Sequence, residues 1–228
     1  MRIAIVGFGK MGRTIRDLAL AQKHEIAAEL DVGQLTHDAV RGADVAIEFT
    51  QPDAAVDNLL KLAAWKIPTV CGTTGWYPRL PEVLAAVDKG RGALVYAPNF
   101  SVGVQVFLRA AADLAKSLAK RPEFDAHIVE THHSEKKDAP SGTAGALREA
   151  AQKQDPKRPY PITSIRAGKV PGTHELHVEA QGESILLQHQ AHDRNIFAAG
   201  ALTAARWLAE KPRQGVFTLE QVLFGDAT

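Results

Sequence analysis

Hydrophobic and polar residues along the first hundred positions follow a repeating order of strand, helix and strand. Short apolar runs rich in β-branched residues predict strands, and longer segments with apolar residues every three or four positions predict helices. The predicted strands are 2–6, 25–30, 44–49, 69–70 and 94–96, and the predicted helices are 11–22, 54–65 and 81–87. This alternation is typical of a parallel sheet covered by helices.

The pattern changes after residue 101. A long helix (102–120), a strand (126–130) and a helix beginning near Ser141 are followed by strand-like runs at 161–166, 174–180 and 184–190, which favour a mixed or antiparallel sheet. Two further helices, 196–209 and 219–224, are expected to return to the first domain. Residues 152–161, with three prolines and several charges, are expected to form a surface loop.

The predicted fold is therefore α/β with two domains. Residues 1–101 with 195–228 form a Rossmann-type, doubly wound parallel sheet that binds a dinucleotide. Residues 102–194 form a second α+β domain, built on a mixed or antiparallel sheet.

Composition narrows the classes of function. The 228 residues are 45% hydrophobic and 23% charged, which excludes disordered and fibrous proteins. The net charge of +1 creates no general attraction to nucleic acid or to an anionic membrane, so neither is an expected partner. No apolar run reaches the roughly 18 residues of a membrane span, and the chain begins without a signal-peptide pattern. The single cysteine, Cys71, excludes an intramolecular disulfide and predicts a reducing, cytoplasmic location.

The first chemical motif is the turn Gly7-Phe8-Gly9-Lys10-Met11-Gly12, which follows a predicted strand and opens a helix. It fits the G-x-G-x-x-G pattern of dinucleotide-binding folds: Gly7 allows a tight turn, Gly9 lets backbone approach a pyrophosphate, and Gly12 allows close packing of helix on strand. Free N–H groups at the helix start would bind the phosphates. The alternative is a glycine turn that only connects two elements.

Asp31 ends the second predicted strand, where the pattern requires an acid that accepts hydrogen bonds from the adenosine ribose. The next residues, Val32, Gly33 and Gln34, include no arginine, so the carboxylate favours NADH over NADPH by repelling a 2′-phosphate. The alternative is that Lys10 or Arg13 pairs with that phosphate.

Two loops follow other predicted strands, where ligands of doubly wound sheets bind. They are Gly72-Thr73-Thr74-Gly75 and Ala97-Pro98-Asn99-Phe100-Ser101. The first would let a nicotinamide ring and its ribose approach the backbone, and Asn99 would hydrogen-bond a carboxamide. The alternatives are ordinary turns, with Ser101 as a helix N-cap.

The densest chemistry lies between Glu130 and Thr143. His132, His133, Lys136 and Lys137 supply proton donors and cations, which hydride transfer to an unsaturated anionic substrate requires. Ser141, Gly142 and Thr143, at a helix start, offer hydroxyls and N–H groups to a carboxylate. One alternative is a solvated charged loop with Ser141 as N-cap.

A metal site is the other alternative, because the chain also contains the pairs His174 with His177 and His189 with His192. In strands, an i, i+3 spacing points the two side chains to opposite faces, so neither pair makes a good chelate. We therefore expect no metal.

The segment His132-His133-x-x-Lys136-x-Asp138-Ala139-Pro140-Ser141-Gly142-Thr143-Ala144 resembles the signature of the 4-hydroxy-tetrahydrodipicolinate (dihydrodipicolinate) reductase family. The glycine turn, both loops, Arg166-Ala167-Gly168, Gly172-Thr173-His174 and Arg194-x-x-Phe197-Ala198-x-Gly200-Ala201 recur in that family's order. The resemblance implies reduction of the cyclic intermediate of diaminopimelate and lysine synthesis, with loss of water, by hydride from NADH or NADPH.

The resemblance also implies residue roles. His132 would be the acid/base group and Lys136 the proton donor, His133 would contact substrate, and Gly142 with Thr143 would hold a carboxylate. The cofactor would lie against residues 7–12, Asp31, Gly72, Thr73, Thr74 and residues 97–100, and the mixed sheet would join four subunits. Two other functions share parts of this pattern: an amino-acid dehydrogenase of similar layout, and a non-catalytic NADH-sensing module.

Overall fold

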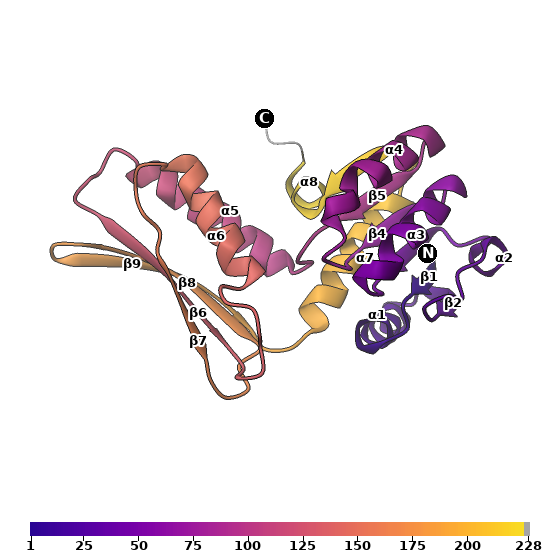
Figure 1. Cartoon of the computed structure of the whole chain (residues 1–228), viewed down its shortest axis with the longest axis horizontal. Coiled ribbons are helices and arrows are strands. Elements are labelled where there is room, and N and C mark those ends of the chain that lie inside the picture. The colour runs from indigo at the N-terminus through magenta and orange to yellow at the C-terminus, as the bar shows by residue number, and fades with distance from the viewer. Residues whose placement is uncertain (226–228) are drawn as a thin grey trace. The chain divides into compact units, whose positions relative to one another are not determined.

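The computed structural model describes residues 1–225, and the chain divides into two compact units (Figure 1). The first unit comprises Met1–Ser101 and the chain from Asn195 onward, and the second comprises Val102–Arg194. Each unit has its own sheet, and within the described residues no strand is shared between them.

The first unit is built on a six-stranded parallel sheet in the order β10-β5-β4-β3-β1-β2. The strands are β1 (Arg2–Val6), β2 (Glu25–Leu30), β3 (Val45–Glu48), β4 (Thr69–Cys71), β5 (Ala93–Tyr96) and β10 (Gly215–Thr218). The helices are α1 (Lys10–Ala21), α2 (His37–Val40), α3 (Pro52–Ala64), η1 (Tyr77–Arg79), α4 (Leu80–Gly90), α7 (Asn195–Ala209) and α8 (Leu219–Phe224). Because β1 lies between β2 and β3, the strand order reverses there, which creates the switch point where such sheets bind ligands.

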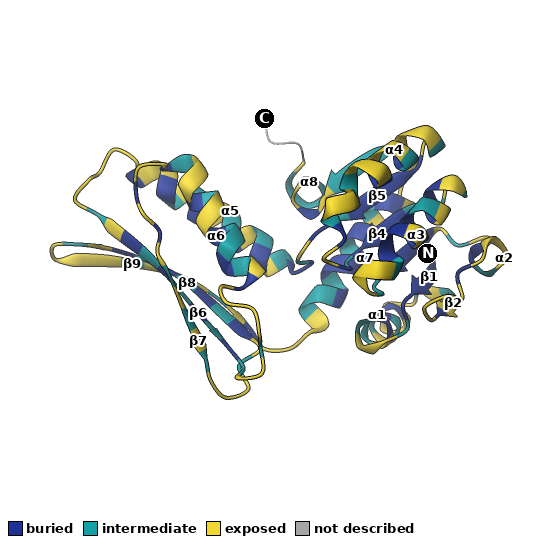
Figure 2. Ribbon diagram, in the orientation of Figure 1, coloured by how far each residue is buried: buried dark blue, intermediate teal, exposed yellow. Residues whose placement is uncertain are grey.

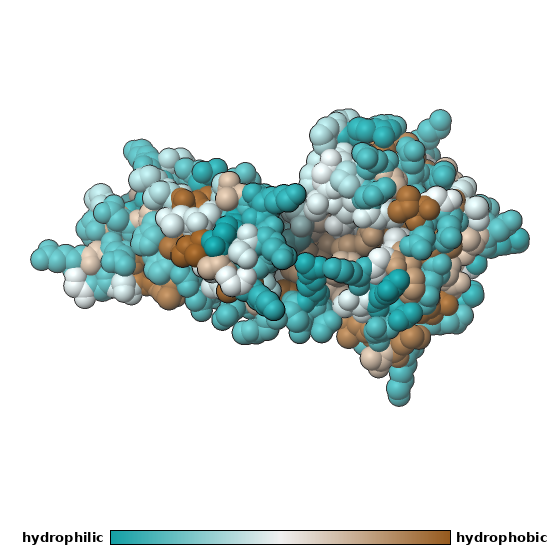
Figure 3. Space-filling model, turned by 60° about the horizontal axis from the view of Figure 1, so that its bottom comes forward, coloured by the Kyte–Doolittle hydropathy of each residue, from teal (hydrophilic) through white to brown (hydrophobic). Residues whose placement is uncertain are grey.

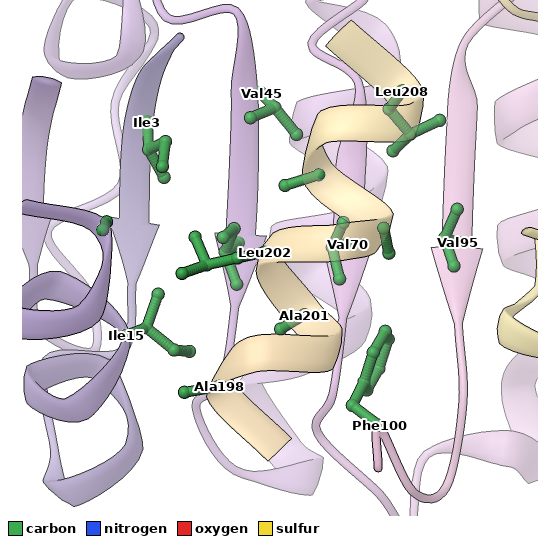
Figure 4. Packing of buried hydrophobic residues seen from close by; sticks show 14 of the residues in the cluster. Ile3, Ile15, Val45, Val70, Val95, Phe100, Ala198, Ala201, Leu202 and Leu208 are labelled. Carbon is green, nitrogen blue, oxygen red and sulfur yellow. The ribbon is translucent and has the colours of Figure 1, made fainter. Parts of the chain in front are cut away.

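Helices cover both faces of this sheet because its strands are apolar on both sides. On one face, α1 and α7 bury residues such as Ile3, Val45 and Val70, and Ala198, Ala201 and Leu202 of α7 point into this layer (Figure 4). On the other face, α3 and α4 enclose a separate cluster that includes Leu59, Val83 and Leu94. The doubly wound parallel sheet predicted from the sequence is confirmed.

The second unit is built on a four-stranded sheet in the order β7-β6-β8-β9. Its elements are α5 (Val102–Leu118), β6 (Asp125–His132), α6 (Gly142–Gln154), β7 (Ile162–Arg166), β8 (Gly172–Ala180) and β9 (Glu183–Ala191). β6 pairs in parallel with β7 and antiparallel with β8, so the sheet is mixed, as predicted. Burial alternates along β6 and β8, and α5 and α6 lie over one face of the sheet (Figure 2).

The expectation of a surface loop over residues 152–161 is correct only in part. Helix α6 continues to Gln154, and the loop that follows exposes its prolines and Lys157 but buries Asp155, Arg158 and Tyr160. The Arg158 guanidinium donates to Asp155 Oδ2 at 2.8 Å and to the Leu118 carbonyl at 2.7 Å. Two of the charges that suggested solvent exposure therefore satisfy each other inside the unit, and the two lysines of the segment are exposed.

The surface is mainly hydrophilic on the face drawn in Figure 3, with hydrophobic residues in separate patches. Large exposed hydrophobic residues are Leu20, Val32, Leu84, Val106, Ile165 and Leu186. Over residues 1–225, no helix is both long enough and apolar enough to span a bilayer.

Candidate active site

The glycine turn after β1 contains two glycines that are packed against backbone and one that is not. Gly7 has a φ of 100°, and a Cβ there would lie 2.2 Å from the Phe49 carbonyl oxygen. A Cβ at Gly12 would lie 2.2 Å from the Gly7 carbonyl oxygen. At Gly9, by contrast, no described atom outside its chain neighbours lies within 4 Å of the Cβ position. Gly9 thus leaves space for a group that approaches the backbone.

A pocket of about 340 Å³ opens beside this turn. It is lined by Gly9, Lys10, Met11, Phe49, Thr50, Pro52, Gly72, Thr73 and Thr74. Helix α1 begins here, and its N-cap, Gly9, has no side chain to accept hydrogen bonds from the first N–H groups. These groups and the positive end of the helix dipole suit a pyrophosphate.

Three lining residues were not predicted from the sequence: Phe49, Thr50 and Pro52, which follow β3. Their place in the chain could have identified them, because β3 is the neighbour of β1 across the switch point and the residues after it must face the glycine turn. The Thr50 N–H donates to Thr73 Oγ1 at 2.8 Å, which ties this segment to the loop after β4.

The buried carboxylate of Glu48 contacts both the segment after β3 and the last residue of β4. Glu48 Oε1 accepts from the Thr50 hydroxyl, and the Cys71 thiol donates to Glu48 Oε2 at a sulfur–oxygen distance of 3.2 Å. Burial, and then the Glu48 charge, raises the pKa of the Cys71 thiol, which stays a protonated donor. The Trp76 indole N–H donates to the Thr73 carbonyl at 2.8 Å, so the loop is fixed from two sides.

Residues of the loop after β5 take part in core packing and in a turn to a greater extent than we predicted. Ala97 and Phe100 are buried in the core, and the Phe100 ring lies 6.0 Å from that of Phe49. Asn99 Oδ1 accepts a hydrogen bond from the Ser101 N–H at 2.8 Å, an interaction typical of a turn. Contact of residues 97–100 with a cofactor stays a prediction.

Asp31 lies next to the glycine turn because the Gly7 N–H donates to the Leu30 carbonyl at 2.7 Å. Asp31 is exposed, and its own N–H donates to Gln34 Oε1 at 2.9 Å. Two guanidinium groups flank the Phe8 ring of the same turn, that of Arg13 at 5.7 Å and that of Arg16 at 5.1 Å. An acid and a basic residue thus both lie near the turn.

In the second unit, β6 carries its buried side chains from the core to the candidate site. Ala126 and Ile128 belong to the hydrophobic cluster, and Glu130 and His132 follow on the same face. Our prediction ended this strand at residue 130; the structure extends it to His132, which pairs with Arg166 of β7. His132 therefore sits on a rigid strand.

The segment after β6 is anchored at several points. The Ser134 N–H donates to the Gly168 carbonyl at 3.3 Å, and Arg166 donates to the Asp138 carbonyl at 2.6 Å. Lys136 Nζ donates to Asp138 Oδ1 at 2.7 Å, and this hydrogen bond is the main reason for the lowered pKa of Asp138. Lys136 is thus held in place, in contrast to the freely solvated loop of the alternative interpretation.

Helix α6 begins directly after this segment. Its N-cap is Ser141, whose Oγ accepts from the Ala144 N–H at 3.2 Å and lies 3.1 Å from His174 Nε2. A Cβ at Gly142 would meet no described atom within 4 Å, so the first turn is open on that side. The N-cap role of Ser141 is real, and it leaves Gly142 and Thr143 at the helix start, where an anion is favoured.

His132 is buried, and burial is the main cause of its lowered pKa. The Glu130 carboxylate raises that pKa, whereas the charges of Lys136 and Arg166 lower it. Burial also lowers the pKa of His174, to about 4, with a smaller effect from His132. Both imidazoles are therefore neutral at neutral pH, and a neutral imidazole can accept a proton.

One cluster of possible metal ligands combines residues of two strands, whereas the pairs considered from the sequence each came from one strand. Glu130, His132 and His174 place ligand atoms within 4.8 Å of one another. His174 and His177 do occupy opposite faces of β8, as predicted. The Arg166 guanidinium donates to the same Glu130 carboxylate at 2.8 Å, and this cation competes with any metal ion for the carboxylate.

Comparisons with known proteins cover nearly the whole chain. The family model "Dihydrodipicolinate reductase, N-terminus" matches residues 1–100, and "Dihydrodipicolinate reductase, C-terminus" matches residues 103–223. The chain belongs to the dihydrodipicolinate reductase family. It is 36% identical over 235 residues to a 4-hydroxy-tetrahydrodipicolinate reductase of Christiangramia forsetii, covering 98% of each chain. It is 34% identical to one of Bdellovibrio bacteriovorus, covering 99% and 97%.

A solved structure shows the same fold. The dipicolinate-bound dihydrodipicolinate reductase from Paenisporosarcina sp. TG-14 has a TM-score of 0.82 and 21% identity, with coverage of 97% of this chain and 98% of that one. The family predicted from the His132 segment is thus confirmed. The chain is an NAD(P)H-dependent oxidoreductase, a 4-hydroxy-tetrahydrodipicolinate reductase of diaminopimelate and lysine synthesis.

Proposed function

We propose that this chain reduces 4-hydroxy-tetrahydrodipicolinate to tetrahydrodipicolinate with His132 as the acid/base group and Lys136 as the proton donor. The observation that supports this best is the buried imidazole at the end of β6, which lies 3.3 Å from the Glu130 carboxylate and whose pKa responds to the charge of Lys136. A residue on a rigid strand beside an anchored ammonium group can transfer a proton at a defined point.

The substrate we propose is a small cyclic dicarboxylate. The Paenisporosarcina relative is described as binding dipicolinate, a molecule of this class. In this chain, Ser141, Gly142 and Thr143 at the start of α6 would bind one carboxylate, and the half-buried His133 would contact the ring or the second carboxylate. Lys136 adds a positive charge that favours the dianion.

The pocket beside Gly9 suits the nicotinamide cofactor, which supplies the hydride when bound. Gly7, Phe8, Gly9, Lys10, Met11, Gly12 and Asp31 would hold its adenosine and pyrophosphate parts. Gly72, Thr73, Thr74 and residues 97–100 would position the nicotinamide part. The open Cβ position at Gly9 is the feature that fits a pyrophosphate.

The proton chemistry follows from charge balance. Loss of water leaves an unsaturated ring, and reduction of that ring takes up one hydride and one proton. In the loss of water, neutral His132 accepts the proton that the ring carbon next to the hydroxyl-bearing carbon loses and returns it to the departing hydroxyl, which leaves as water. In the reduction, the Lys136 ammonium supplies the one proton and is reprotonated from solvent.

Lys136→Ala tests this assignment in an assay in which the substrate is generated enzymatically. We expect kcat to fall by about 100-fold or more, because general acid catalysis contributes about that much. The affinity for NADH, measured by fluorescence titration, should stay within about twofold of wild type, because Lys136 belongs to the second unit. Lys137→Ala removes an equal charge from an exposed neighbour and should keep normal turnover. Normal turnover in Lys136→Ala would contradict the assignment.

We further propose a preference for NADH over NADPH. The exposed Asp31 carboxylate, at the end of β2, would accept hydrogen bonds from the two ribose hydroxyls and repel a 2′-phosphate. Arg13 is near the same turn, but its guanidinium lies over the Phe8 ring.

The last part of the proposal concerns assembly and location. We propose a homotetramer in which the second unit's sheet joins the subunits, because the sheet face away from α5 and α6 exposes Ile165 and Leu186. A cytoplasmic location agrees with the one cysteine, Cys71, being a free thiol.

A further inference from the structure

Glu130 is a fully buried carboxylate at the centre of the second unit's polar cluster. The sheet register explains its neighbours: Glu130 of β6 lies opposite Ser164 of β7 and His174 of β8. Opposed residues project to the same face of a sheet, as does His132, two positions further along β6. Four polar side chains therefore meet on the face of the sheet that also carries the apolar core of the unit.

The two carboxylate oxygens have different surroundings. Oε1 accepts three hydrogen bonds, from the Ser141 N–H at 3.0 Å, the Ser164 hydroxyl at 2.7 Å and the Arg166 guanidinium at 2.8 Å. Oε2 lies 3.3 Å from His132 Nδ1 and 3.8 Å from His174 Nε2, close enough for charge interaction but without the alignment of a hydrogen bond. Oε1 thus joins the sheet to the start of α6, and Oε2 faces the imidazoles.

Glu130 keeps its charge despite its burial. Burial alone raises its pKa, but the hydrogen bonds from Ser141, Ser164 and Arg166 outweigh this effect and lower the pKa to about 2. A carboxylate beside Nδ1 favours the tautomer that carries its proton there, which leaves Nε2 as the proton acceptor. A side chain at Gly172 would meet His132 Nε2 at 3.0 Å, so only glycine leaves room for the ring on that side.

We propose that Glu130 is a positioning residue that aligns two parts of the site at once. Through the charge on Oε2 it favours the tautomer of His132 that carries its proton on Nδ1, and through Oε1 it holds Ser141 and hence the start of α6. Arg166 extends the second action, because its guanidinium binds both Glu130 and the Asp138 carbonyl. The carboxylate makes its contacts with protein groups, and its effect on the reaction passes through His132 and the helix start. This inference rests on the acid/base role proposed for His132.

Glu130→Gln tests the inference, because glutamine keeps the shape and removes the charge. The groups that face His132 are Glu130 of β6, Arg166 of β7, His174 of β8, and Lys136 and Asp138 of the intervening segment. Removal of the carboxylate leaves mainly positive neighbours, so the His132 titration, followed by NMR of the ring, should move to lower pH by about one unit. We expect kcat to fall roughly 10-fold to 100-fold with NADH affinity unchanged.

Glu175→Gln is the matched control. Glu175 lies on β8, faces the opposite side of the sheet and pairs with a different imidazole, that of His177, at 3.0 Å. The Glu175→Gln substitution makes the same chemical change in the same sheet, and it should leave the His132 titration at its wild-type position. A folded Glu130→Gln protein with an unmoved titration and wild-type kcat would overturn the proposal.

A measurement on the wild-type enzyme keeps the inference testable if Glu130→Gln does not fold. The ¹⁵N shifts of the His132 ring report its tautomer, and we expect the proton on Nδ1. A neutral ring with its proton on Nε2 would overturn the proposal. These NMR readouts need no substrate, so they can fail while the reductase assay succeeds, and the converse also holds.

Discussion

The negative charge of Asp31 is expected to determine the preference of the enzyme for NADH over NADPH. We expect the wild-type enzyme to show a higher kcat/KM with NADH than with NADPH. In Asp31→Ser the repulsion of a 2′-phosphate is removed and a hydroxyl can still bind the ribose, so kcat/KM with NADPH should rise about tenfold, equal to about 1.4 kcal/mol. Asp38→Ser, a change at another exposed acid of the first unit, should leave the ratio unchanged. A strong NADPH preference in the wild-type enzyme would contradict our interpretation of Asp31.

Single residues were predictable where the chemistry forms a continuous motif. Gly9 and Gly12 differ in the structure as their places in the motif require, one open and one packed against backbone. Phe49 and Glu130 were not assigned roles, because their contacts come from strand neighbours far apart in sequence. Glu130 and His174 are 44 positions apart, and only the antiparallel register of β6 and β8 brings them together.

At the scale of elements, β8 and the start of α6 are joined by an imidazole whose neutrality stabilises the fold. Folding lowers the pKa of His174 from 6.5 to about 4, mainly through burial, so the unfolded chain binds the proton first as the pH falls. The stability that depends on neutral His174 is complete above pH 6.5 and is lost between pH 6.5 and about 4. In His174→Gln the slope of the free energy of unfolding against pH, measured in urea, should become smaller by at most about 1.4 kcal/mol per pH unit, while His132, whose pKa is also lowered, keeps its own contribution.

His192→Gln provides the comparison, because it removes an exposed imidazole and should keep the wild-type slope. An unchanged slope in His174→Gln would show that His174 already titrates normally in the folded enzyme. Loss of the hydrogen bond to Ser141 should lower the stability of His174→Gln at all pH values, and this offset is separate from the slope.

Long periodic elements were predictable because burial imposes their pattern. Helices α5 and α7 and strands β8 and β9 lie within two residues of the predicted bounds. The elements that were missed, α2, η1 and β10, span three or four residues, too few for a period to emerge. Strand β10 is stabilised by its pairing with β5, and its own sequence contains too few residues to predict a strand. The prediction for residues 152–161 was only partly correct for another reason: the Asp155–Arg158 pair is buried, and composition alone does not distinguish a buried ion pair from a solvated one.

At the scale of the whole molecule, the sheet of the second unit is expected to join subunits. Leu186 of β9 is 53% exposed and lies opposite His177 on the face of the sheet that α5 and α6 leave uncovered. Light scattering should show the wild-type protein at four times the mass of one chain. Leu186→Asp should shift it to smaller species, because a charge buried in an apolar contact has no partner. Leu20→Asp, on α1 of the first unit with a similar exposure of 52%, should remain tetrameric. A monomeric wild-type protein, or a tetrameric Leu186→Asp, would mean that the exposed leucine has another role than subunit contact.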